Sequence, residues 1–137
     1  MRKLILFFQP VAKYVLIIWL LLILIFSITP NLPTINVNVR WLLFRFDYII
    51  HFLEYATLSV LAILTFIPYS FRSMMARFCL VLLTLIVFAI INELLHLIIP
   101  GRTFEPNDIL SNILGIASGI FFIGILYRIA FRIPKKA

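Results

Sequence analysis

Ionisable side chains at helical spacing in two stretches of the chain could form a site for chemistry. Asp47, His51 and Glu54 follow one another at intervals of four and three residues, which places them on one face of a helix. Glu93 and His96 are three residues apart, so they are neighbours across one helical turn. Carboxylates and imidazoles transfer protons, bind polar ligands and coordinate metals. Each of these functions requires helices that bring the two stretches together.

A third polar stripe follows a charged loop. Asp108, Asn112 and Gly115 have the same four- and three-residue spacing, and the loop before them, GRTFEPND, carries Arg102. Ionisable groups inside a membrane are costly and normally face the interior of a helix bundle. We therefore expect the three stripes to converge on one polar pocket, with Arg102 as the counter-ion of its acids.

The composition indicates where such helices lie. The chain has 137 residues, of which 64% are hydrophobic and 12% charged, and its mean hydropathy is +1.17. Soluble domains are about 45–50% apolar and about 25% charged, so a water-soluble domain and a disordered chain are both excluded. The single cysteine, Cys79, excludes an internal disulfide and a cysteine-based zinc cluster. We predict a single-domain, all-α integral membrane protein over residues 1–137.

Four apolar segments predict the membrane-spanning helices, since a crossing takes about 20 mostly apolar residues. They are residues 14–28, 47–66, 78–99 and 108–127. Proline-containing stretches end the first three, and the first is followed by a polar connector, TPNLPTINVNVR. Asn107 or Asp108 is the expected N-cap of the last helix. The short connections favour a four-transmembrane-helix bundle in up-down order.

The charge distribution predicts the orientation. Nine of the 12 Lys and Arg residues flank the spans on one side, and three, Arg40, Arg45 and Arg102, lie on the other. Basic residues concentrate on the cytoplasmic side of membrane proteins, so both termini are predicted to be cytoplasmic. All five acids and both histidines then fall at the outer ends of the spans or in their linker, which places the pocket at the outer leaflet. Because the net charge of +7 follows this pattern, we expect no nucleic-acid partner.

Two other interpretations of the polar residues compete with a binding site. They could form an interhelical network that only holds the bundle together, but apolar packing would be less costly than so many buried ionisable groups. The pairs His51–Glu54 and Glu93–His96 resemble ligand pairs of di-iron centres in helical bundles, yet a full centre needs more carboxylates at one level. We therefore predict no metal and no other cofactor.

The last span also carries a ridge of small residues, Ser111, Gly115 and Gly119, at four-residue intervals. Such a ridge lets another helix approach closely. Ser111 follows Asp108 by three residues and is the hydroxyl weighed as a nucleophile, but helix packing explains it better than nucleophilic catalysis does.

Two longer segments carry a resemblance to a known family: DYIIHFLEY in the second span and ELLHLIIPGRTFEPNDILSNILGIASG across the third and fourth. Together with the four-span layout, they resemble VanZ-like membrane proteins, the family of the teicoplanin-resistance protein. The family pattern falls on Asp47, His51, Tyr55, Glu93, Pro100, Arg102, Asp108, Asn112 and Gly115, over roughly residues 14–128. Two positions depart from it, since Tyr48 stands where the family commonly has Lys and His96 where it commonly has Gln.

The resemblance implies a multi-pass protein of the bacterial inner (cytoplasmic) membrane. In some members it implies low-level resistance to lipoglycopeptide antibiotics, but it implies no established reaction. The predicted ligand-binding residues, from the spacing and the resemblance together, are Asp47, His51, Glu54, Tyr55, Glu93, His96, Arg102, Asp108 and Asn112.

Three functions remain open on this evidence. The first is binding of a membrane lipid, a lipid-linked envelope precursor or an amphiphilic antibiotic, whose polar head Arg102 and the acids would hold. The second is an intramembrane hydrolase or transferase acting on a lipid phosphate, with His51 as base or nucleophile and Asp47 or Glu54 orienting it. The third is a proton-coupled carrier that uses Glu54, Glu93 and His96 as a relay, although four spans are few for a monomeric carrier.

Overall fold

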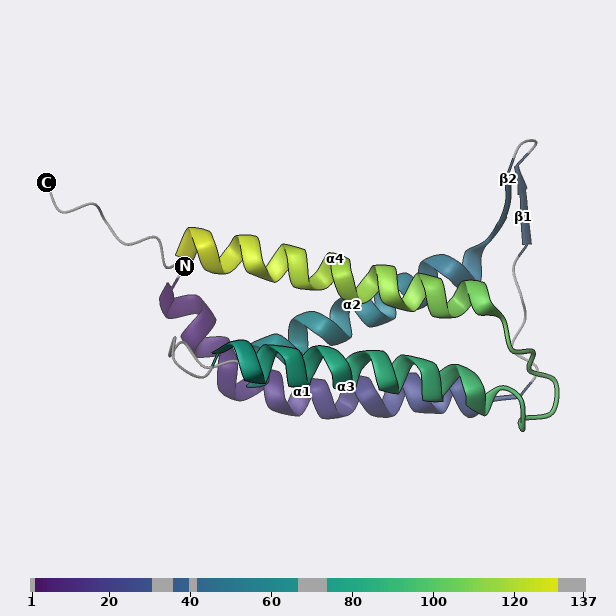
Figure 1. The fold of residues 1–137 in the computed structure, drawn as a ribbon, viewed down its shortest axis with the longest axis horizontal. Helices are drawn as coiled ribbons and strands as arrows, with labels where there is room; N and C mark the ends of the chain where they lie inside the picture. Colours follow the sequence, from purple (N-terminus) through teal and green to yellow (C-terminus); the bar gives the residue numbers. More distant parts are fainter. Residues whose placement is uncertain (1, 31–35, 40–41, 67–73, 131–137) are drawn as a thin grey trace, which may run out of the picture.

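The computed structural model describes residues 2–30, 36–39, 42–66 and 74–130 (Figure 1). Its elements in chain order are α1 (Arg2–Ile28), β1 (Asn36–Val39), β2 (Leu42–Arg45), α2 (Phe46–Phe66), α3 (Met74–Leu95) and α4 (Pro106–Ala130). In the described part of the chain, four helices are long and apolar enough to cross a membrane, which confirms the prediction of four such helices. The predicted connections and orientation depend in part on residues outside the described ones: Pro33, Arg40, Pro68, Arg72, Arg132, Lys135 and Lys136.

The first and third helices differ in length from the predicted spans 14–28 and 78–99. α1 begins at Arg2 because the basic and apolar residues before the span also favour a helix. Pro10 lies inside α1, and the first turns point in a different direction from the rest of the helix (Figure 1), as a proline kink produces. α3 ends at Leu95, and His96 follows in a tight turn. The His96 N–H donates to the Glu93 carbonyl at 3.1 Å.

The predicted N-cap of the last helix is wrong. α4 begins at Pro106, whose missing N–H costs nothing at the first position of a helix. Asn107 and Asp108 therefore lie inside the first turn, where the helix dipole favours an acid such as Asp108. Glu105 is the residue that precedes the helix.

A β-hairpin replaces part of the predicted connector after the first span. β1 pairs with β2 in antiparallel register, with Val37 opposite Phe44 and Asn38 opposite Leu43. The strand signal is the strict alternation of Asn and Val over residues 36–39. We missed it because the polarity of the segment alone favoured a connector.

The helices alternate in direction, so each end of the bundle collects specific helix termini (Figure 1). The end of α1, the start of α2, the end of α3 and the start of α4 lie together beside the hairpin, and we call this the hairpin end. α2 contacts all three other helices and has its most extensive contact with α4. The core between the helices is apolar, and its most buried members are Leu16, Ile23, Tyr55, Leu58, Ala62, Leu85, Ala89 and Ile116.

Two glycines set the distance between α2 and α4. A Cβ atom on Gly115 would overlap the Phe52 carbonyl oxygen, and one on Gly119 would overlap the Ala56 carbonyl and the Ser59 hydroxyl. The predicted ridge is thus confirmed at both glycines, whereas the hydroxyl of Ser111 donates to the Asn107 carbonyl of its own helix at 2.9 Å. We call the contact of Gly115 and Gly119 with α2 the glycine seam. The glycine seam holds the polar starts of α2 and α4 side by side.

Candidate functional site

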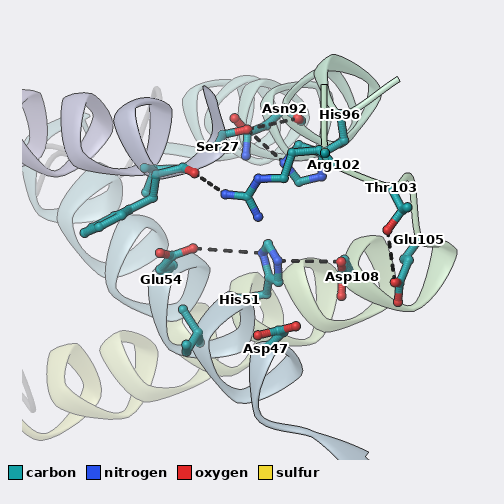
Figure 2. A pocket seen from close by; sticks show the side chains of 14 residues that line it. Ser27, Asp47, His51, Glu54, Asn92, His96, Arg102, Thr103, Glu105 and Asp108 are labelled. Atoms are coloured by element: carbon teal, nitrogen blue, oxygen red, sulfur yellow. Dashed lines mark hydrogen bonds and ion pairs between the residues drawn. The ribbon is translucent and has the colours of Figure 1, made fainter. Parts of the chain in front are cut away.

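A cavity of about 360 Å³ opens at the hairpin end between the helices and the loop before α4 (Figure 2). Its volume lies in the range of small-molecule sites, about 300–1,000 Å³. Six of the nine predicted ligand-binding residues line it: Asp47, His51, Glu54, His96, Arg102 and Asp108. The other lining residues are the apolar Ile23, Phe26 and Ile50 and the polar or small Ser27, Asn92, Gly101, Thr103 and Glu105.

The three remaining predicted residues, Tyr55, Glu93 and Asn112, are wholly buried and are not among the lining residues. Tyr55 belongs to the apolar core, where its ring centroid lies 6.2 Å from that of Phe88. Neither amide atom of Asn112 has a hydrogen-bond partner among the described residues. Tyr55 and Asn112 can therefore influence a ligand in the cavity only through their neighbours. A carboxylate oxygen of Glu93, in contrast, lies within 4.8 Å of ligand atoms of His51 and Asp108, which line the cavity.

His51 lies between two carboxylates at distances longer than hydrogen bonds. Its Nδ1 is 3.9 Å from Glu54 Oε2, and its Nε2 is 3.7 Å from Asp108 Oδ2 (Figure 2). The helical spacing brings His51 and Glu54 to one face of α2, as predicted, and the glycine seam brings Asp108 of α4 opposite them. The imidazole thus joins two of the polar stripes.

The third helix adds a continuous chain of polar contacts. Glu93 Oε1 is 3.1 Å from His96 Nδ1 and accepts the Glu105 N–H at 3.1 Å. His96 Nε2 is 3.1 Å from the Ser27 hydroxyl, which lies on α1. With His96 neutral and Nδ1–H donating to Glu93, Nε2 can accept the Ser27 proton, for which the Asn92 carbonyl at 3.4 Å from the same hydroxyl is the competing acceptor. This order of serine, histidine and carboxylate is that of nucleophilic catalytic triads.

Sequence reasoning missed Ser27. Ser111 lies close to Asp108 along the chain, whereas Ser27 and His96 are 69 positions apart. The signal was its position at the end of the first span, since the up-down order places that end at the level of the third span's outer end. Ser27 lines the cavity and is buried.

Arg102 joins the loop to the end of α1. Its Nε donates to the Thr29 carbonyl at 3.1 Å and its Nη2 to the Phe26 carbonyl. Carbonyls at a helix C-terminus have no partner within the helix, so the guanidinium satisfies them while its charge acts on the Glu54 carboxylate. Gly101, with a φ of 79°, supplies the left-handed turn that lets the loop present Arg102.

Charge in the site is unbalanced. Asp47, Glu54, Glu105 and Asp108 line the cavity, but Arg102 is the only Arg or Lys among the described residues that do. The predicted role of Arg102 as counter-ion therefore covers only part of the acidic charge. A site with this excess of acid attracts cations and ligand groups that donate hydrogen bonds.

The predicted di-iron-like pairs do not meet as such in the structure. Among the described residues, the group of three side chains whose positions could hold one metal ion is instead His51, Glu93 and Asp108, one from each of α2, α3 and α4. One ligand atom from each lies within 4.8 Å of the others.

Comparison with known proteins adds no assignment, because no protein-family model, curated protein or solved structure matches the chain. The interpretation of the site therefore depends on its own geometry.

Proposed function

We propose that this protein is a multi-pass protein of the bacterial cytoplasmic membrane, with both termini cytoplasmic, and that its cavity binds an amphiphile at the outer leaflet. The single observation that carries the proposal is a cavity with a charged interior and an apolar rim at one end of an apolar helix bundle. Basic residues such as Lys13, Arg77 and Arg128 belong to the other end, which supports the orientation.

The apolar rim suggests how such a ligand would enter. Phe26 and Ile50 line the cavity and are nevertheless 51% and 43% exposed. They therefore belong both to the cavity and to the outer surface of the bundle, which would contact lipid tails. An acyl or prenyl chain could remain on that surface while its head group occupies the cavity.

The polar interior selects the head group. Arg102 and Thr103 can donate hydrogen bonds, whereas the four lining acids accept them when ionised. The acids outnumber the arginine, so a head group rich in hydroxyls or amines is favoured over a bare anion. A lipid-linked envelope precursor and an amphiphilic glycopeptide both have this character.

We further propose that the chain is a VanZ-like protein with a role in glycopeptide tolerance. The support comes from the sequence pattern and from the gathering of four of its polar positions, Asp47, His51, Arg102 and Asp108, around one cavity. The departure at His96 adds an imidazole that contacts Ser27 and Glu93.

A second candidate, an intramembrane hydrolase or transferase, is supported by the contacts of Ser27, His96 and Glu93. The Ser27 oxygen would attack a phosphate or acyl ester while its proton passes to His96 Nε2. His96 would then protonate the leaving alkoxide, and water would later release the serine. Arg102, bonded to the carbonyls on both sides of Ser27, is placed to stabilise negative charge. In this candidate, Ser27 as nucleophile and His96 as base take the role of base or nucleophile that the sequence-based hypothesis gave to His51.

Binding measurements in lipid nanodiscs test the first proposal. Wild type should bind teicoplanin or a polyprenyl-linked saccharide, and Arg102→Lys should weaken binding at least about 10-fold because a lysine cannot reproduce the planar donor fork. Arg128→Lys, on an exposed residue of the other end, is the matched control and should bind as wild type does. Equal binding by both variants would contradict the proposal, and turnover lost in Ser27→Ala with binding retained would favour the second candidate.

A further inference from the structure

We propose that His51, Glu93 and Asp108 bind a divalent transition-metal ion, Zn²⁺ or Mn²⁺, at the inner wall of the cavity. The three side chains come from three different helices, and one ligand atom of each lies within 4.8 Å of the other two. An imidazole nitrogen with two carboxylate oxygens is a donor set that these ions accept. The inference corrects the sequence-based prediction that no metal is bound.

The separation of His51 and Asp108 fits two ligands of one ion better than a direct contact. Their nearest nitrogen and oxygen atoms are 3.7 Å apart, beyond the usual range of a hydrogen bond. Two donors each about 2.1 Å from a tetrahedral zinc are about 3.4 Å apart. A small movement of the side chains therefore closes the site around an ion.

The Glu93 carboxylate is an independent observation in favour of a bound ion. Its side chain is wholly buried, and its Oε2 atom has no hydrogen-bond partner among the described residues. A buried carboxylate oxygen without a partner is costly. The other oxygen, Oε1, is held by His96 and by the Glu105 N–H, which orients the carboxylate as outer-shell groups do in metal sites.

Glu54 is the candidate outer-shell partner of His51. If Nε2, which faces Asp108, binds the ion, Nδ1 carries the proton. Nδ1 has no hydrogen-bond partner in the described part of the chain, and Glu54 Oε2 lies 3.9 Å from it. Glu54 is thus placed to accept that proton once the ring turns, giving the carboxylate–histidine–metal arrangement common in proteins.

The charge of the cavity favours a cation. A divalent ion would neutralise the carboxylates of Glu93 and Asp108, which lie together with the His51 imidazole. Three protein ligands leave a coordination position open, and water or a ligand oxygen would fill it. Metal binding needs no amphiphile, so the proposal stands separately from the proposed function.

Metal analysis of the purified, full-length protein tests this inference. After treatment with a chelator, incubation with Zn²⁺ and desalting, wild type should retain about one zinc per chain. His51→Gln and Asp108→Asn should weaken zinc affinity by more than about 100-fold, and His96→Gln, which removes only an outer-shell contact, by about 10–100-fold. Asp47→Asn is the matched control, because Asp47 lines the same cavity outside the group of three, and its affinity should stay within about threefold of wild type.

Either of two results overturns the proposal: no stoichiometric zinc in wild type, or the same loss in Asp47→Asn as in Asp108→Asn. If the variants fail to fold, a measurement on the wild-type protein alone still tests the site. Pulsed electron paramagnetic resonance of the protein with bound Mn²⁺ should show coupling to an imidazole nitrogen, and a spectrum without it would overturn the site. Loss of amphiphile binding with zinc retained would contradict only the proposed function.

Discussion

The two ends of the bundle share the same helices but differ in what they can bind. The hairpin end holds a cavity of about 360 Å³ lined by four acids. The other end has a hollow lined by Pro10, Lys13, Tyr14 and Thr65, with no acid among these described residues. Since α1 and α2 contribute to both hollows, helix packing alone does not make the site. The difference lies in the polar residues at one set of helix ends and in the loop that carries Arg102.

Cysteine labelling should give the largest difference between the two ends. In a Cys79→Ser background, Thr103→Cys at the hairpin end and Ala76→Cys at the start of α3 are both exposed positions. An impermeant thiol reagent applied to intact cells should label the first and not the second, because the proposed orientation puts only the hairpin end outside. Labelling of Ala76→Cys alone would reverse the orientation and remove the outer-leaflet site.

The glycine seam should matter most for stability, because it holds the middle of the bundle between both ends. Gly119→Ala should lower the free energy of unfolding by about 1–3 kcal/mol, since the new methyl group overlaps α2. Gly124→Ala is the matched control on the same helix, where a Cβ atom meets nothing within 4 Å. Thermal unfolding in detergent measures both variants. Equal unfolding midpoints for the two variants would show that α2 and α4 are not in close contact at Gly119.

Arg102 should contribute to stability as well as to binding. Arg102→Lys should cost about 1–2 kcal/mol, because a lysine cannot satisfy both carbonyls that the guanidinium reaches at the end of α1. The same thermal unfolding assay compares it with Arg128→Lys at the other end. A loss of equal size in the control would mean that the hairpin end gains nothing from this contact.

Ser27 gives the smallest expected effect. Ser27→Ala removes the buried contacts of the hydroxyl with His96 Nε2 and the Asn92 carbonyl and should cost about 0.5–1.5 kcal/mol. Ser111→Ala removes only a hydroxyl contact within α4 and should cost less. Urea or thermal unfolding compares the two variants. If Ser111→Ala lowers the free energy of unfolding more than Ser27→Ala does, the polar contacts from Ser27 to Glu93 do not join α1 to α3.

The sequence predicts the helices and the members of the site better than it predicts their contacts. Spacing along α2 places His51 and Glu54 on one face, because the helix repeat fixes that relation. It does not say that Asp108 faces them, since the rotation between helices depends on where Gly115 and Gly119 meet α2. Ser27 was missed for the same reason: its relation to His96 is set by packing between helices.

The hairpin and the loop show a second limit. The Asn–Val alternation was a readable strand signal, but the hydrogen bonds of Arg102 to the end of α1 join residues more than 70 positions apart. The sequence shows that Arg102 is a cation near acids. Only the structure shows that its Nε and one Nη atom donate to backbone carbonyls at the end of α1.

Photocrosslinking tests most directly the claim that one end of the bundle binds an amphiphile. A polyprenyl-linked saccharide with a diazirine on its head group would be irradiated with the protein in nanodiscs, and the modified peptides mapped by mass spectrometry. The account predicts modification around the cavity, at residues 23–27, 47–54 and 101–108, with competition by unlabelled ligand. Modification spread evenly along the apolar helix surfaces, or concentrated near Lys13 and Thr65 at the other end, would contradict it.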